Sequence, residues 1–161
     1  MSARARFLNE FPKAIADDVA AVFVGAGMSM EAGYPSWKDL LREIAEELGL
    51  KTSDVSDLAA LAQWSVRKTA GRTRVNSVIR SEIAPDKPVP EALETLARLP
   101  IRNVWTTNYD RLIERAFADV GRPLDTTSSA KDLSLRPRPG AARLFKMHGS
   151  VDRLDDIDRY R

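Results

Sequence analysis

Residues 21–29 constrain the fold more than any other part of this sequence. Four apolar residues, two of them β-branched, run directly into Gly25 and Gly27. Such a run is typical of a buried parallel strand that ends in a phosphate-binding turn. Glycines allow a sharp bend and a close approach of ligand to backbone, because they have no Cβ. A helix that begins just after them would favour an anion at the same point.

We therefore expect a nucleotide pocket at the carboxyl end of the first strand. The pattern alone leaves a plain tight turn open as the alternative. The dinucleotide fingerprint has glycine at its sixth position, where this chain has Met30, and the next glycine is Gly33.

The order of the remaining elements predicts an α/β fold with a Rossmann-like parallel sheet and flanking helices. Apolar spacing and capping residues predict helices over 3–19, 36–49, 57–68, 73–83, 90–99 and 112–121, and strands over 20–25, 101–106 and 142–147. Residues 123–140 read as a loop with one short strand at 122–126. The tail, 151–161, shows no apolar pattern.

Composition excludes several classes of protein. The chain has 161 residues, 43% of them apolar, which is enough for one globular domain. A net charge of +2 argues against direct binding of nucleic acid. The absence of cysteine excludes disulfides and cysteine-bound zinc within the chain. No apolar run is long enough to span a membrane and no signal peptide is recognisable, so we expect a cytoplasmic protein.

Several residues allow two interpretations. Trp37 is either a core anchor or a wall of the ligand pocket. Asn108 follows the second strand as either a helix N-cap or a ligand group. His148, the single histidine, ends the third strand and is either structural or chemical. A basic cluster reads as a solvated helix end, with a nucleic-acid patch as the alternative; its members are Arg67, Lys68, Arg72 and Arg74.

Polar residues follow three strands, and together they resemble a known family. The segments are Gly25-Ala26-Gly27-x-Ser29 with Gly33-x-Pro35-x-Trp37, then Thr106-Thr107-Asn108-Tyr109-Asp110, then Lys146-x-His148-Gly149-Ser150. In this order they resemble the sirtuin family, and most closely its sirtuin-like branch in prokaryotic anti-phage defence, found in Thoeris and sirtuin–Argonaute systems. The resemblance extends from about residue 15 to residue 152 and implies a Rossmann-like sheet that binds NAD.

The resemblance also implies a role for each matching residue. Asn108 would hold the nicotinamide ribose or the attacking water, Asp110 would contact the nicotinamide amide, and His148 would be the catalytic base. The other cofactor-binding residues would be Gly25, Ala26, Gly27 and Ser29 at the phosphates, Pro35 and Trp37 in a flexible cofactor loop, and Thr107, Gly149 and Ser150 beside them.

Departures from the family pattern point away from protein deacetylation. Deacetylating sirtuins carry a zinc module built on four cysteines, so no zinc is expected here. Their loop reads Pro-Asp-Phe-Arg where this chain has Pro35-Ser36-Trp37-Lys38, and their asparagine motif reads Gln-Asn-Ile-Asp where it has Thr107-Asn108-Tyr109-Asp110. The resemblance therefore implies hydrolysis of NAD to ADP-ribose and nicotinamide, with no metal.

Two rival functions remain open at this point. The same pocket could sense NAD or ADP-ribose without cleaving it, or the domain could dock a partner protein of a defence system. We expect no direct nucleic acid and no membrane as partners, and oligomerisation stays open. The family's domain continues beyond its His-Gly-Ser motif, so the resemblance implies that residues 1–161 are the N-terminal portion of a domain that is truncated at its C-terminus.

Overall fold

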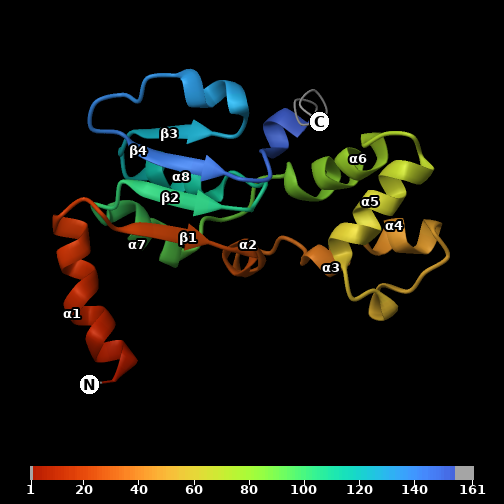
Figure 1. Ribbon diagram of the computed structural model, residues 1–161, viewed down its shortest axis with the longest axis horizontal. Coiled ribbons are helices and arrows are strands. Elements are labelled where there is room, and N and C mark those ends of the chain that lie inside the picture. The colour runs from red at the N-terminus through yellow and green to blue at the C-terminus, as the bar shows by residue number, and fades with distance from the viewer. Residues whose placement is uncertain (1, 155–161) are drawn as a thin grey trace.

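A four-stranded parallel sheet forms the centre of the computed structural model, which describes residues 2–154 (Figure 1). Its strands are β1 (Ala21–Val24), β2 (Asn103–Thr106), β3 (Leu124–Thr127) and β4 (Ala142–Lys146). The strand order is β1-β2-β4-β3, and all three pairings are parallel. This confirms the predicted α/β fold with a Rossmann-like parallel sheet.

Strand register brings three of the strand ends side by side. Val24 pairs with Thr106, and Thr106 pairs with Lys146. The segments that follow β1, β2 and β4 therefore leave the same edge of the sheet at neighbouring positions. This is the edge at which open parallel sheets bind ligands.

Helices cover one face of the sheet. The helices α7 (Glu91–Arg98) and α8 (Leu112–Asp119) contact each other and pack against a face that presents the fully buried Val104 and Leu144. The opposite face presents Phe23, which is 60% exposed, and Trp105, which is 39% exposed. The expectation that the first strand is buried is therefore wrong, because β1 lies at the edge of the sheet and only one of its faces is covered by the described residues.

A group of helices lies beyond the carboxyl ends of the strands (Figure 1). It comprises α2 (Ala26–Glu31), α3 (Trp37–Leu40), α4 (Arg42–Glu47), the short 3-10 helix η1 (Thr52–Asp54), α5 (Leu58–Lys68) and α6 (Thr73–Ile83). The single helix predicted over 36–49 is wrong in one respect. It breaks at Leu41, where ψ is 4°, although the predicted apolar stripe is buried on both sides of the break.

The N-terminal helix α1 (Ala3–Ala16) differs from its prediction in length and in burial. It ends three residues early, near Asp18, whose positive φ of 58° is incompatible with a continuing helix. No residue of α1 is buried, and Phe7 and Leu8 are 56% and 60% exposed. Its periodicity predicted the helix correctly, but no other described residue covers its apolar face.

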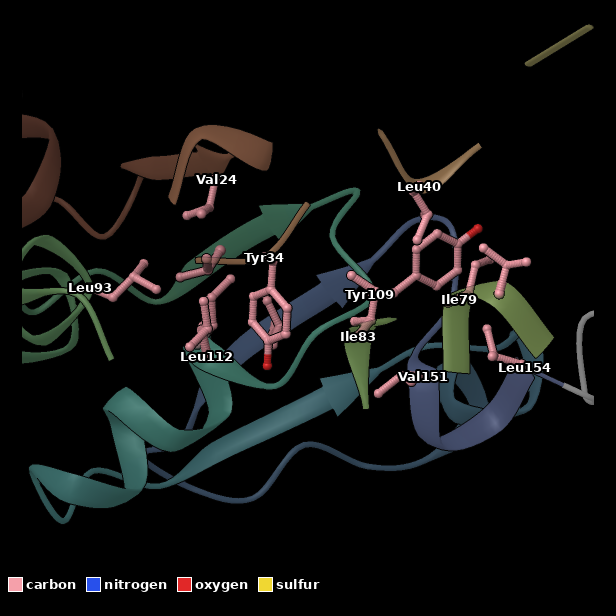
Figure 2. Close-up of a cluster of buried hydrophobic side chains, with 14 of the residues drawn as sticks. Val24, Tyr34, Leu40, Ile79, Ile83, Leu93, Tyr109, Leu112, Val151 and Leu154 are labelled. Atoms are coloured by element: carbon pink, nitrogen blue, oxygen red, sulfur yellow. The ribbon is translucent and has the colours of Figure 1, made fainter. Parts of the chain in front are cut away.

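Two segments predicted as irregular contain ordered structure. The 123–140 segment holds the expected short strand, β3, and also a 3-10 helix, η2 (Ala130–Ser134), with a capping box between Ser129 and Asp132. Residues 151–154 form a short 3-10 helix in which Val151 and Leu154 are buried. Figure 2 shows both side chains in the same apolar cluster as Ile79 and Ile83 of α6. Residues 155–161 of the predicted tail lie outside the described part of the chain.

Within residues 2–154, no helix combines the length and the apolar character that a membrane crossing requires.

Candidate functional site

The bend after β1 leads directly into α2. Gly25 is the N-cap of this helix, with φ of −100°. Neither Gly25 nor Gly27 has a positive φ, so the expectation that this bend needs the conformational freedom of glycine is wrong. A Cβ added at either position would meet no described atom within 4 Å. What glycine provides here is open space beside the backbone, where a ligand could approach closely.

Three side chains from two strand ends form a buried hydrogen-bond chain. The Asn108 carboxamide nitrogen donates to the Gly25 carbonyl (3.0 Å) and to the Ser29 hydroxyl (2.9 Å). The Ser29 hydroxyl then donates to Asp110 Oδ2 at 2.5 Å. Because the Gly25 carbonyl can only accept, the Asn108 carboxamide orientation is fixed by the backbone. Both bonds use the carboxamide nitrogen, and Oδ1 is the acceptor of this side chain.

A fourth buried group connects the same two strands. Thr106, which is fully buried, donates its hydroxyl to the Val24 carbonyl (2.8 Å) and accepts from the Asn108 backbone N–H (3.0 Å). These two bonds fix the start of the loop after β2 against the end of β1. The loop is therefore positioned by neutral hydrogen bonds that are shielded from water, where they are stronger.

The N-cap interpretation of Asn108 is wrong. The first turn of α8 is served by Asp110, whose Oδ1 accepts from the Leu112 N–H at 3.0 Å. Asn108 is thus left to face β1 and α2. Thr107, which lies between Thr106 and Asn108, is half-buried.

Two hollows flank this network. The smaller, of about 30 Å³, is lined by Ser29, Asn108 and Asp110 together with Ala26, Pro35, Trp37, Leu40, Ile83 and Tyr109. The larger, of about 1180 Å³, lies between α5, α6, the 127–133 segment and the end of β4, and includes His148 and Gly149.

Trp37 and Tyr109 line both hollows and form the wall between them. Their rings meet edge to face, with centroids 5.7 Å apart, and the Tyr109 ring lies 6.4 Å from that of His148. Both interpretations of Trp37 are therefore satisfied: it packs against the core residue Tyr109 and it also borders the hollows.

The third strand end contributes His148 from the far side of this wall. His148 is exposed and lines the larger hollow, whereas Asn108 lines the smaller one. Gly149 adopts φ of 93°, a conformation that favours glycine, and is buried. Ser150 is 5% exposed. The structure thus brings the predicted residues to one edge of the sheet and divides most of them between two adjoining hollows. Neither hollow is lined by Gly25, Gly27, Thr107 or Ser150.

Tyr34 connects the segment before α3 to a distant loop. Its hydroxyl donates to the Pro85 carbonyl at 2.9 Å, and its side chain is buried. Burial, followed by the negative charges of Asp110 and Asp86, raises the pKa of Tyr34 above its ordinary value of 10.0. The phenol is therefore a neutral donor at pH 7, and it anchors the start of the segment that carries Pro35 and Trp37.

Sequence reasoning missed Lys146, a lysine with only 3% exposure. Its Nζ donates to the Asp110 carbonyl, to Tyr109 O (3.3 Å) and to Glu114 Oε1 (2.9 Å). The alternation of β4 could have identified it, because Ala142 and Leu144 point inward and position 146 continues the same face.

The positive charge of the basic cluster near α5 and α6 is partly neutralised, because Arg74 pairs with two glutamates. This guanidinium lies 3.0 Å from Glu43 Oε2 and 2.5 Å from Glu47 Oε1. Arg72 borders the larger hollow rather than an outer surface. The solvated helix end is therefore the better interpretation of this cluster than a nucleic-acid patch.

Comparison with known proteins shows which family this chain is similar to. A model of the SIR2-like domain matches residues 102–159. The chain is 39% identical over 162 residues to the NAD(+) hydrolase ThsA of Bacillus cereus, and 40% identical over 149 residues to that of Cytobacillus dafuensis, covering 96% and 92% of this chain. It is 28% identical over 130 residues to defense-associated sirtuin 2 of Bacillus subtilis, covering 79% of this chain and 13% of that protein.

The chain spans 34% and 30% of the length of the two ThsA proteins, about a third of each. The matches to the two ThsA proteins nevertheless cover almost all of the chain, and the family model covers the ends of β2 and β4. The chain therefore belongs to the sirtuin-like, or SIR2-like, family.

Proposed function

We propose that the protein containing this chain hydrolyses NAD at the nicotinamide–ribose bond, releasing nicotinamide and ADP-ribose, as part of anti-phage defence. The observation that most directly supports this is the hydrogen-bond chain from Asn108 through Ser29 to Asp110, beside the open space at Gly25 and Gly27. The names of the relatives, NAD(+) hydrolase and defense-associated sirtuin, support the same reaction and setting.

The proposed placement of NAD begins at the bend after β1. Its pyrophosphate lies over Gly25, Ala26 and Gly27, where the two glycines contribute no Cβ beside the backbone. The nicotinamide ribose then lies within reach of Asn108, and the nicotinamide amide contacts Asp110. Remaining contacts are proposed for Ser29, Pro35, Trp37, Thr107, Gly149 and Ser150.

Cleavage of NAD suits these residue types. Nicotinamide leaves as a neutral molecule from a cationic pyridinium, so no general acid is needed, although the transition state remains oxocarbenium-like as in glycoside hydrolysis. Asn108 Oδ1 can accept a hydrogen bond from a ribose hydroxyl or from the attacking water. His148, whose neutral imidazole has a ring nitrogen that can accept a proton, is the proposed base. Binding energy at the pyrophosphate holds the ribose in place for attack.

The smaller hollow must enlarge to admit nicotinamide. About 30 Å³ is the share of liquid volume that one water molecule occupies, which is far less than a nicotinamide ring. We propose that Pro35 and Trp37 form its movable side, because both follow Gly33, whose φ is 93°, and Trp37 is the first residue of the four-residue helix α3. We infer that this segment opens when NAD enters, and that Trp37 then packs against the bound ligand.

Nicotinamide release by the full-length protein tests this function. The wild-type protein should convert NAD to nicotinamide and ADP-ribose. Asn108→Ala and His148→Ala should each lose at least about a hundredfold in kcat, the lower end of the range for removing one acid–base group. Both variants should still bind ADP-ribose. Unchanged turnover in both variants would contradict the assignment of these residues.

The second candidate function is a sensor that binds NAD or ADP-ribose without cleaving it. The separation of Asn108 and His148 into different hollows favours it, because no described contact joins them. Saturable binding of NAD with no nicotinamide release would support the sensor. A partner protein of a defence system and a cytoplasmic location are further parts of the proposal, testable by co-purification and by cell fractionation.

A further inference from the structure

We propose that Lys146 is a positioning residue that holds the two chemical loops, residues 107–110 after β2 and residues 147–151 after β4, in register with each other. This inference goes beyond the proposed function but assumes that NAD binds at the same edge of the sheet. The Lys146 ammonium group is surrounded by protein oxygens, so its proposed role is to hold these loops, although the residue also borders the larger hollow.

Its burial calls for an explanation. Lysine is almost never fully buried unless its charge is paired. The Lys146 side chain is 1% exposed, at the last residue of β4, on the face that packs against α8. A lysine at this position is costly to desolvate, and an apolar residue would fill the core without that cost. The ammonium group therefore has a use that an apolar side chain could not supply.

The contacts of the ammonium group show what that use is. Two of its partners are backbone carbonyls of the loop after β2, at Tyr109 and Asp110. A third is the Ser150 hydroxyl in the turn after β4, at 3.4 Å. Glu114 of α8 supplies the compensating charge at 2.9 Å. Lysine has three donors and no acceptor, which suits a group that gathers oxygens from several segments.

A backbone bond repeats the same connection. The Val151 N–H donates to the Tyr109 carbonyl at 2.9 Å. The two loops therefore converge on one carbonyl, which accepts from Lys146 and from Val151. Asn108 precedes this carbonyl by one residue, and His148 follows Lys146 by two. Removing the ammonium group takes away its contacts with both loops and leaves this backbone bond in place.

The expected consequence is a loss of geometry at the nicotinamide end of the site. Misplacement of reacting groups by about 1 Å can cost about a hundredfold in rate. The bend at Gly25 and Gly27 has no contact with Lys146, so binding of the ADP-ribose portion should persist. A merely structural role would instead lower all activities together with the folded fraction.

The test compares Lys146→Met with Leu144→Ala in the full-length protein. Leu144 is fully buried two residues earlier on the same strand face, and its truncation weakens the core without touching either loop. Lys146→Met should lower kcat/KM for nicotinamide release by roughly tenfold or more per folded molecule, with affinity for ADP-ribose within about threefold of wild type. Leu144→Ala should change neither value by more than about threefold.

Two further variants keep the proposal falsifiable. Glu114→Gln removes the compensating charge and keeps the carbonyl contacts. It should lower the free energy of unfolding, because a buried ammonium group loses its counter-charge, but retain kcat/KM per folded molecule within about threefold. A loss of kcat/KM per folded molecule as large as that of Lys146→Met would assign the effect to the ion pair and overturn the proposal. If Lys146→Met does not fold, Lys146→Gln replaces it, with a donor retained but no charge.

If the wild-type protein releases no nicotinamide, the proposed function is refuted, but the positioning role of Lys146 is not. The readout is then the ratio of NAD affinity to ADP-ribose affinity by calorimetry, which Lys146→Met should lower by roughly tenfold and Leu144→Ala should leave unchanged. In either case, equal behaviour of Lys146→Met and Leu144→Ala overturns the positioning role.

Discussion

The Ser29 hydroxyl donates a 2.5 Å hydrogen bond to the Asp110 carboxylate, joining residues that are 81 positions apart in the sequence. Ser29 lies in α2, directly after β1, and Asp110 lies in the loop after β2. The same hydroxyl accepts from Asn108, so one serine connects the bend after the first strand to both polar residues of the second strand end. The ends of β1 and β2 thus form one hydrogen-bonded unit at the candidate site.

Ser29→Ala should therefore affect stability as well as binding. It leaves a buried carboxylate oxygen and a buried amide hydrogen without their partner, which typically costs about 1–3 kcal/mol. Urea denaturation should show this loss in the free energy of unfolding. Ser53→Ala is the matched control, because Ser53 is exposed and bonds only to its neighbour Asp54, and it should stay within about 0.5 kcal/mol of wild type. Equal stability of the two variants would show that the buried bond contributes nothing.

Gly27→Ala should separate binding from folding. A Cβ at this position meets no described atom within 4 Å, and alanine is favoured over glycine in a helix by about 1 kcal/mol, so the variant should be at least as stable as wild type. If pyrophosphate lies against this backbone, the added methyl group should weaken NAD binding by at least about tenfold, or about 1.4 kcal/mol.

Gly121→Ala is the control, because it should lose stability and keep its NAD affinity, the opposite of the result expected for Gly27→Ala. Gly121 ends α8 with a positive φ of 68°, far along the chain from the bend after β1. Alanine there should lower the free energy of unfolding by about 1 kcal/mol and leave NAD affinity unchanged. Retained NAD affinity in Gly27→Ala would mean that the pyrophosphate lies elsewhere.

The sequence predicted the parallel sheet and most helices because their apolar residues recur at clear intervals. It also predicted that the segments after three strands meet, since the strands of a parallel sheet end at the same edge. It could not predict that Asp110 rather than Asn108 serves the first turn of α8. Both residue types are good caps, and only the backbone path decides which of them reaches Leu112.

Other features depend on tertiary contacts that no local pattern encodes. Leu41 interrupts a stripe that reads as one helix, and its break is visible only in the backbone angles. Val151 and Leu154 are two apolar residues in a charged segment, yet both are buried against α6 and the loop after β2. The separation of Asn108 and His148 into two hollows follows from the positions of Trp37 and Tyr109, which sequence spacing does not specify.

Acid should destabilise the β3 region through Asp125. Hydrogen bonds from the backbone N–H and the guanidinium of Arg138 lower the pKa of Asp125 below its ordinary value of 3.8. A carboxylate with a depressed pKa in the folded state contributes stability above its unfolded pKa and loses it as the pH falls through the folded pKa. Stability should therefore decline below about pH 4, in part through this group.

Asp125→Asn should flatten that decline. Chemical denaturation at a series of pH values from neutral to acid should give a smaller slope of unfolding free energy against pH below about pH 4 than in wild type. Arg138→Met, which removes the guanidinium partner, should flatten the same window. An unchanged slope in both variants would show that this pair does not couple folding to protonation.

The most direct test of the account is a crystal structure of the full-length His148→Ala variant with NAD bound. The account predicts one dinucleotide that contacts all three strand ends, with its pyrophosphate against Gly25 and Gly27. Its nicotinamide ribose should lie between Asn108 and the position of the missing imidazole. A dinucleotide bound away from the bend after β1, or one that reaches Asn108 but leaves residue 148 outside contact distance, would contradict the account.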